Sequence, residues 1–296
     1  MSNQDIIIEK EVKTPSKLKD YVMLLKLRLS FLVVLSAVSG YFFAVETFDT
    51  IEFLYLVFGG FLITGASNGF NQIIERDIDK LMKRTANRPL PAGRMSVTEA
   101  LIVSISFGIL GAIFLYQLNL WSCILGVVAL ILYAAVYTPL KRITPWAVFI
   151  GAFPGAIPPM LGVVAITNDF NLLVGIMFFV QFAWQFPHFW AIAWVSDDDY
   201  KKGGFSLLPS RGRKDQVSAN WILYSTLLMI PVGVLPYIFN ETGIISLIVG
   251  FLAGLWFFIY ALRFYKDLDD KLARKLMFAS FIYLPIIQFL YVFNKI

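Results

Sequence analysis

Cysteine and histidine are almost absent from this chain of 296 residues, which holds one of each, Cys123 and His188. A single cysteine excludes a disulfide framework and a CxxC metal site. Charge is also scarce: 15% of the residues are charged and 58% are hydrophobic, whereas a soluble protein has about 25% charged residues. The first 20 residues are polar and lack the regions of a cleavable signal peptide. We therefore expect a short soluble tail with little structure over residues 1–20 and one membrane-embedded domain over residues 21–296.

Nine long apolar segments occupy most of the chain. A helix needs about 20 mostly apolar residues to cross roughly 30 Å of hydrocarbon. The segments are residues 21–44, 51–74, 98–116, 120–137, 146–166, 172–194, 221–239, 243–262 and 276–293. The sequence therefore predicts an all-α, polytopic membrane bundle of nine transmembrane helices.

The basic residues lie almost entirely on one side of this predicted bundle. The tail and every second loop carry 24 of the 25 Lys and Arg residues, and only Lys295 falls on the other side. Because basic loops remain in the cytoplasm, we expect a cytoplasmic N-terminus in the inner (plasma) membrane. Membrane orientation thus accounts for the net charge of +5, and no nucleic-acid partner is needed.

Polar residues at the cytoplasmic end of the second predicted span form a first cluster. Asn71, Glu75 and Asp79 are four residues apart, which places them within about 80° of arc on one helix face. Carboxylates beside an amide suit Mg²⁺, which prefers oxygen ligands and binds to protein carboxylates together with substrate phosphate. Cations that can bind phosphate follow at Lys83, Arg84 and Arg88. The order predicts a magnesium–diphosphate site.

A simpler interpretation of this cluster is a helix end whose charges pair locally. Arg76 with Asp79, or Asp79 with Lys83, has the spacing for such a pair. That interpretation leaves the amides of Asn68 and Asn71, deeper in the membrane, without a role. Polar groups at that depth are costly and favour a functional site.

A second cluster with the same order lies after the sixth predicted span. Three acidic residues are followed by two cations: Asp197, Asp198 and Asp199, then Lys201 and Lys202. Two clusters on the same membrane face can hold two metal ions with a diphosphate between them. The sequence therefore predicts that the two helix ends meet.

The sixth predicted span also carries a polar stripe. Gln181, Gln185, His188 and Asp199 fall within about 60° on a regular helical wheel, although Pro187 is expected to kink the helix. The stripe indicates a polar interior. His188 has two interpretations: a packing histidine that is hydrogen-bonded across the bundle, or a group that contacts substrate or haem or transfers a proton.

These two stretches resemble the UbiA superfamily of intramembrane prenyltransferases. The superfamily's first motif, Asn-x-x-x-Asp-x-x-x-Asp, corresponds to Asn71, Glu75 and Asp79, with a carboxylate kept in the middle place. The runs ERDIDKLMKRTANRPLPAGRM, WQFPHFWAIAW and DDYKKGGFSLLP resemble the branch that farnesylates haem. The second region departs from the superfamily's spaced triple-Asp motif because Asp198 and Asp199 are adjacent. Which of the three neighbouring aspartates binds metal is therefore open.

The resemblance implies a nine-span UbiA-like fold and a specific reaction. A farnesyl group would pass from farnesyl diphosphate to the 2-vinyl group of haem B, with addition of water, to give haem O. The implied cofactor is Mg²⁺, held by Glu75, Asp79 and Asp198 or Asp199. The implied cations for the diphosphate oxygens are Lys83, Arg84, Arg88, Lys201 and Lys202. The implied surroundings are the lipid bilayer and a downstream haem A synthase or terminal oxidase assembly.

Three other functions are compatible with parts of this pattern. A superfamily enzyme that prenylates an aromatic quinone precursor would share the diphosphate site but not the acceptor. A transporter or channel would have polar residues across the full thickness of several helices, whereas these gather at the cytoplasmic side. A non-catalytic haem chaperone would release no diphosphate.

Overall fold

The computed structural model describes residues 16–296, which are almost entirely helical. Within this range nine segments are long and apolar enough to cross a membrane, so the predicted fold class is confirmed. Seven of them are single helices: α2 (Leu27–Ala44), α3 (Thr50–Ile74), α5 (Val97–Tyr116), α8 (Ala147–Thr167), α9 (Leu172–Val195), α13 (Ile244–Asp267) and α14 (Asp270–Phe293). Two are composite: α6 (Leu120–Ile131) continues through the π-helix η1 (Leu132–Tyr137) into α7 (Thr138–Leu140), and α11 (Gln216–Val232) is followed by α12 (Leu235–Ile238).

The first predicted span is wrong at its start, because the chain breaks at Lys26. A short helix α1 (Lys17–Leu25) ends there, and Lys26 takes the left-handed conformation with φ of 47° before α2 begins. Helix α1 exposes Lys17 and Lys19 but buries Leu24, so it is amphipathic rather than membrane-spanning. The predicted tail therefore ends before Lys17; its residues 1–15 lie outside the described residues.

The last two spans are longer than predicted. Helix α13 ends at Asp267 and α14 begins at Asp270, so most of the predicted loop between residues 262 and 276 is helical. Leu268, at φ of 51°, makes the tight turn between the two helices. The charged residues of this region stand on helix ends that extend past the apolar segments.

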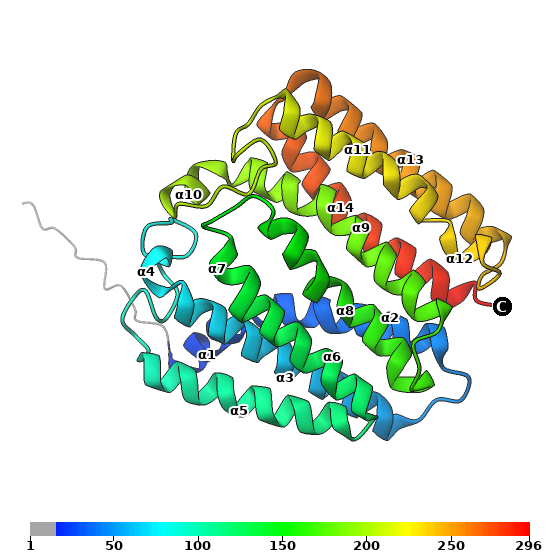
Figure 1. Cartoon of the computed structure of the whole chain (residues 1–296), viewed down its shortest axis with the longest axis horizontal. Helices are drawn as coiled ribbons and strands as arrows, with labels where there is room; N and C mark the ends of the chain where they lie inside the picture. Colours follow the sequence, from blue (N-terminus) through cyan, green and yellow to red (C-terminus); the bar gives the residue numbers. More distant parts are fainter. Residues whose placement is uncertain (1–15) are drawn as a thin grey trace, which may run out of the picture.

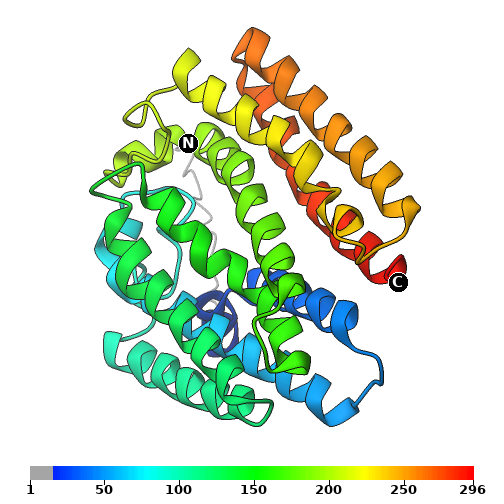
Figure 2. The same ribbon diagram turned by 45° about the vertical axis from the view of Figure 1, so that its right-hand side comes forward.

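The spans pack in two groups that share α9. Helices α2, α3, α5, α6 and α8 lie together, and α11, α13 and α14 lie together on the other side of α9 (Figures 1 and 2). Helix α2 packs closely on α8: a side chain at Gly40 would collide with the Pro159 carbonyl, and one at Gly162 with the Ala37 carbonyl. Small residues that let backbones approach are typical of helix contacts in membranes.

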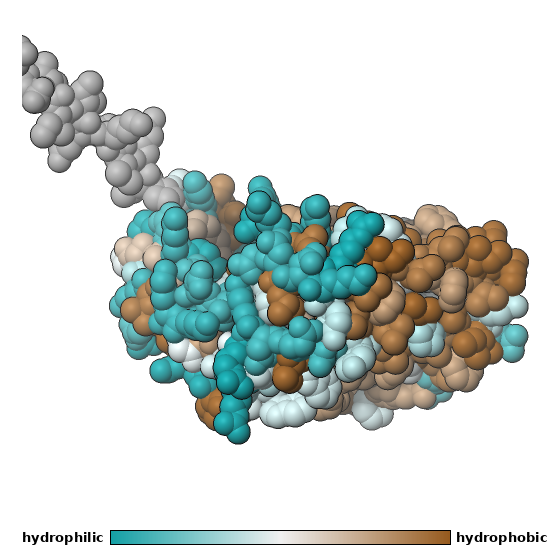
Figure 3. All heavy atoms as spheres, turned by 90° about the horizontal axis from the view of Figure 1, so that it is seen from above, coloured by the Kyte–Doolittle hydropathy of each residue, from teal (hydrophilic) through white to brown (hydrophobic). Residues whose placement is uncertain are grey.

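Hydrophilic side chains gather at one end of the molecule (Figure 3). This end carries the short helices α4 (Arg76–Asp79) and α10 (Asp197–Lys202) (Figure 1). The sides of the bundle instead expose large apolar residues, such as Ile109 and Ile248. A polar end and apolar sides are the surface of a multi-pass membrane protein.

Candidate functional site

A cavity of about 450 Å³ extends from the polar end into the middle of the bundle. Charged side chains line only its outer end: Lys26, Glu75, Asp79, Arg84, Arg88 and Lys141. Leu29 and Leu32 of α2 and Phe281 of α14 line the cavity and are also exposed on the outside of the bundle. Apolar side chains of α2 and α14 therefore form an incompletely covered part of the cavity wall.

Asn71, Glu75 and Asp79 line this cavity together, on three successive helical turns. Helix α3 ends at Ile74 and α4 follows, yet the Glu75 amide still donates to the Asn71 carbonyl at 3.0 Å and the Asp79 amide to the Glu75 carbonyl at 2.8 Å. The helical spacing thus continues through the bend at Glu75. All three side chains are buried.

Glu75 is held by neighbours from two segments. Its Oε2 accepts a hydrogen bond from Asn71 Nδ2 at 2.8 Å, and its Oε1 lies 2.5 Å from Lys141 Nζ, just after α7. Asn71 Oδ1 in turn accepts from Lys26 Nζ at 3.1 Å. Asn71 therefore orients the carboxylate, and Lys141 compensates its charge.

Asp79 is fully buried, and among the described residues only one of its two carboxylate oxygens has a partner. Its Oδ2 forms an ion pair with Arg88 Nη1 at 2.6 Å, whereas its Oδ1 has no hydrogen-bond partner among residues 16–296. Burial raises the pKa of Asp79, and the Arg88 guanidinium opposes that shift. A buried carboxylate oxygen without a partner is costly, so a bound cation would stabilise it.

The local ion pairs of the simpler interpretation do not form at Asp79. Asp77, not Asp79, pairs with Arg76 at 3.5 Å and with Lys80 at 2.9 Å, and Asp77 lies on the exposed side of the helix. Lys83 is exposed and does not line the cavity. Charge pairing within one helix therefore does not explain the buried carboxylates.

Sequence reasoning missed two cavity cations, Lys26 and Lys141. Burial, together with the neighbouring Arg88 and Lys141, lowers the pKa of Lys26 to about 7. Burial also lowers the pKa of Lys141, and Glu75 opposes that shift. Lys26, Arg88 and Lys141 face only two carboxylates, so the polar end can carry excess positive charge and suits an anionic substrate.

The sequence signal for Lys141 is its spacing from two tyrosines. Tyr133, Tyr137 and Lys141 are four residues apart and all line the cavity. The Lys141 ammonium also lies 5.0 Å from the centre of the Tyr137 ring. Tyr133 and Tyr137 belong to η1, and π-helical turns are frequent at functional sites. The spacing of four residues that identifies the first cluster could also have identified the helix face formed by Tyr133, Tyr137 and Lys141.

The second predicted cluster touches the connection that follows the first. Asp199 Oδ2 accepts a hydrogen bond from the Arg84 amide at 3.3 Å, and the Arg84 guanidinium lies 4.5 Å from the centre of the Tyr200 ring. Arg84 and Tyr200 line the cavity, but Asp198 is exposed and does not. The two cations of this cluster are exposed and form local pairs: Lys201 with Asp197 at 2.7 Å and Lys202 with Asp199 at 3.6 Å.

The four predicted metal ligands are not gathered into one site. Among residues 16–296 no three His, Cys, Asp or Glu side chains come close enough to hold a metal ion together. The helix break before α10 turns Asp198 outward and Asp199 toward Arg84. Glu75 and Asp79, with the free Asp79 Oδ1, still fit a Mg²⁺ ion that completes its coordination with substrate phosphate oxygens.

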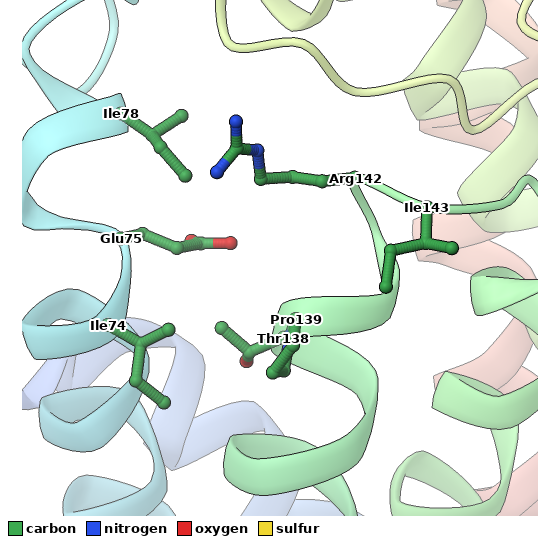
Figure 4. Close-up of a pocket in the computed structure, with 7 residues that line it drawn as sticks. All are labelled: Ile74, Glu75, Ile78, Thr138, Pro139, Arg142 and Ile143. Carbon is green, nitrogen blue, oxygen red and sulfur yellow. The ribbon is translucent and has the colours of Figure 1, made fainter.

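Glu75 also borders a second pocket on the outer side of α3 and α7. Figure 4 shows Glu75 and Arg142 extending into this space from opposite sides, with the Thr138 side chain beside them. The pocket has a volume of about 430 Å³, and Ile74 and Ile143 on its rim are exposed. The Glu75 carboxylate therefore borders both the central cavity and the outer surface of the bundle.

The polar stripe of α9 lines the inner part of the central cavity. Gln181, Gln185 and His188 all border it, whereas Asp199 does not. Gln288 of α14 donates to Gln181 at 3.0 Å and accepts from the Ser36 hydroxyl of α2 at 3.2 Å. These neutral groups link three helices around the cavity.

An all-helical membrane bundle with buried carboxylates and excess cations at one end of an apolar cavity is the architecture of an intramembrane prenyltransferase. The chain belongs to the UbiA prenyltransferase family, whose model matches residues 33–284.

Two relatives indicate which enzyme of this family the chain is similar to. The chain is 47% identical over 285 residues to protoheme IX farnesyltransferase of Christiangramia forsetii, covering 95% of this chain and 94% of that protein. It is 45% identical over 283 residues to protoheme IX farnesyltransferase of Cytophaga hutchinsonii, covering 95% and 99%.

Solved structures share the fold at low sequence identity. A digeranylgeranylglyceryl phosphate synthase superposes with a TM-score of 0.78 at 22% identity, covering 94% of this chain and 98% of that one. A UbiA homologue from Archaeoglobus fulgidus, bound to GPP and Mg²⁺, has a TM-score of 0.65 at 16% identity, covering 92% and 99%.

Proposed function

We propose that this protein transfers a farnesyl group from farnesyl diphosphate to the 2-vinyl group of haem B, with addition of water, to form haem O. The observation that carries the proposal is the identity of 47% to a protoheme IX farnesyltransferase along 95% of the chain. The cavity supports it, because a cationic end suits a diphosphate and an apolar interior suits an isoprenoid chain and a porphyrin. Haem O would then be used by a haem A synthase or terminal oxidase assembly.

The diphosphate would bind at the charged end of the cavity. Arg84 and Arg88 offer guanidinium groups to its oxygens, and Lys26 and Lys141 add point charges. A magnesium ion held by Glu75 and Asp79 would neutralise the leaving diphosphate. Asn71 acts as a positioning residue, because it holds Glu75 by one hydrogen bond and Lys26 by another.

The reaction needs a dry cavity after the carbon–oxygen bond of farnesyl diphosphate breaks. The bond's electron pair leaves with the diphosphate, and the terminal carbon of the vinyl group attacks the allylic cation. Water then adds to the cation formed beside the porphyrin ring and loses a proton. Tyr133, Tyr137 and Phe205 line the cavity beside the charged residues, so aromatic rings would exclude bulk water where the allylic cation forms.

The distribution of Lys and Arg supports a cytoplasmic orientation of the charged end. In the topology predicted from the sequence, the N-terminal tail and the loops on this side carry 24 of the 25 basic residues of the chain, and basic loops remain on the cytoplasmic side. The protein would span the plasma membrane with its N-terminus inside. Farnesyl diphosphate and Mg²⁺ would then reach the site from the cytoplasm.

The test is an assay of purified full-length protein in lipid nanodiscs with farnesyl diphosphate, Mg²⁺ and one of two acceptors. We expect stoichiometric haem O and diphosphate with haem B, and no product with 4-hydroxybenzoate. Prenylation of the hydroxybenzoate alone would assign the chain to quinone synthesis instead. Haem binding without release of diphosphate would identify a chaperone and overturn the proposal.

A further inference from the structure

The inner part of the cavity contains one metal-ligating side chain, His188. Every charged residue that lines the cavity belongs to its outer end, and the inner residues near His188 are amides and aromatic rings. Gln181 and Gln185, on the same helix, hydrogen-bond to Gln288 and to the Ala152 carbonyl. The chemistry of this region therefore depends on which ring nitrogen of one imidazole carries the proton.

The hydrogen bonds around Ser280 favour one tautomer of this imidazole. The Ser280 Oγ lies 2.6 Å from the Met277 carbonyl oxygen and 2.7 Å from His188 Nδ1. When the hydroxyl donates its single proton to the Met277 carbonyl, it accepts from Nδ1, which then carries the imidazole proton. In this tautomer the other ring nitrogen, Nε2, holds a lone pair and no proton.

Two aromatic side chains fix the orientation of the ring. Trp184 stacks on the imidazole with a centroid distance of 4.3 Å, and Phe281 makes a T-shaped contact with it at a centroid distance of 4.7 Å. The Trp184 indole also donates to the Ser280 carbonyl at 2.9 Å. Ser280 thus anchors both the imidazole and the ring stacked on it.

The Nε2 atom has no hydrogen-bond partner among the described residues, and its residue lines the cavity. Histidine ligands of metals have this arrangement: one ring nitrogen donates to an oxygen and the other presents its lone pair to the metal. A purely structural histidine, in contrast, would use both nitrogens or turn the free one into apolar packing.

We infer that His188 Nε2 binds the iron of the acceptor porphyrin, an inference that rests on the proposed function. His188 lies seven residues before the end of α9, which places it about 10 Å inside the charged end at 1.5 Å per residue. The iron–imidazole bond holds the porphyrin at this depth, on the apolar side of the proposed diphosphate site. Ser280 acts as a positioning residue that keeps the lone pair on Nε2.

The test compares binding of haem B with binding of metal-free protoporphyrin IX, because only haem B offers iron to the imidazole. Full-length protein in nanodiscs is titrated with each porphyrin and followed by Soret absorbance and tryptophan quenching. We expect the wild type to bind haem B at least tenfold more tightly than protoporphyrin IX, with the spectrum of an imidazole-ligated haem. His188→Ala should lose this preference, and added imidazole should restore the spectrum.

Two further variants separate ligation from folding. His188→Gln fills similar space and can still donate to Ser280, so it should remain folded and also lose the imidazole spectrum. Ser280→Ala should retain the spectrum with an affinity for haem B lowered several-fold. An unchanged spectrum and preference in both His188 variants would overturn the inference, even if the wild type makes haem O. Absence of haem O from the wild type would instead overturn the proposed function.

Discussion

The two ends of the central cavity are lined by different kinds of side chains. The outer end holds two carboxylates and four cations, whereas the inner end holds amides, a serine hydroxyl and one imidazole. Charges at the outer end come from segments near the membrane boundary, where their burial costs less than at the bilayer centre. This difference underlies the proposed roles of the two ends: the outer end would bind the anionic diphosphate, and the inner end would position the porphyrin acceptor.

Substitution of Asp79 should give the largest effect and tests the outer end directly. Asp79→Asn keeps the side-chain volume but removes the charge that would attract a cation. We expect kcat for haem O formation to fall by about 10²–10³-fold, the range seen when one electrostatic group of an active site is removed. Glu75→Gln should act similarly. The matched control is Asp77→Asn, at an exposed position on the same helix, which should retain activity.

Arg88 and Lys83 provide the next comparison, between a cavity cation and an exposed one. Arg88→Ala should raise KM for farnesyl diphosphate about tenfold, equivalent to a loss of about 1.4 kcal/mol. Lys83→Ala should change it less than twofold, because Lys83 does not line the cavity. Initial rates at varied farnesyl diphosphate concentration measure both. Equal effects of the two variants would show that surface charge, not the cavity, recruits the diphosphate.

Asp198 and Asp199 should differ although they are neighbours. Asp199 holds the Arg84 amide at 3.3 Å and so links α10 to the connection after α4. We expect Asp199→Asn to lower kcat/KM for farnesyl diphosphate about fivefold to tenfold, equivalent to about 1–1.4 kcal/mol, which is the size of a typical net hydrogen bond of about 0.5–1.5 kcal/mol. Asp198→Asn should be nearly silent. A larger loss for Asp198 would mean that α10 turns to bring this carboxylate to the substrate.

The smallest effect is expected at the inner end. Gln288→Leu removes the link between Gln181 and Ser36, and such interhelical hydrogen bonds contribute about 0.6 kcal/mol each. We expect KM for haem B to rise about threefold while KM for farnesyl diphosphate is unchanged. A change confined to farnesyl diphosphate would reverse the assignment of the two ends.

The sequence predicted the parts of the molecule that depend on local periodicity. The nine spans follow from apolar length, and the shared face of Asn71, Glu75 and Asp79 follows from their spacing of four. The helix break at Lys26 was missed, because nothing in its neighbours marks a left-handed residue.

The partners of the carboxylates could not be predicted, because they come from other helices. Lys26 and Lys141 reach Asn71 and Glu75 through the packing of α2 and α7 on α3, and no single-helix pattern encodes that. The placement of Asp199 on the polar stripe was wrong for a related reason: α9 stops at Val195, so the wheel of α9 does not extend to α10, and Asp199 does not line the cavity.

Mass spectrometry of haem extracted from cells tests the central claim most directly. The host should lack its own haem O activity and express either this chain or its Asp79→Asn variant at equal membrane levels. We predict haem O in cells with the wild-type chain and only haem B in cells with the variant. Haem B alone in both strains, or equal haem O in both, would contradict the account.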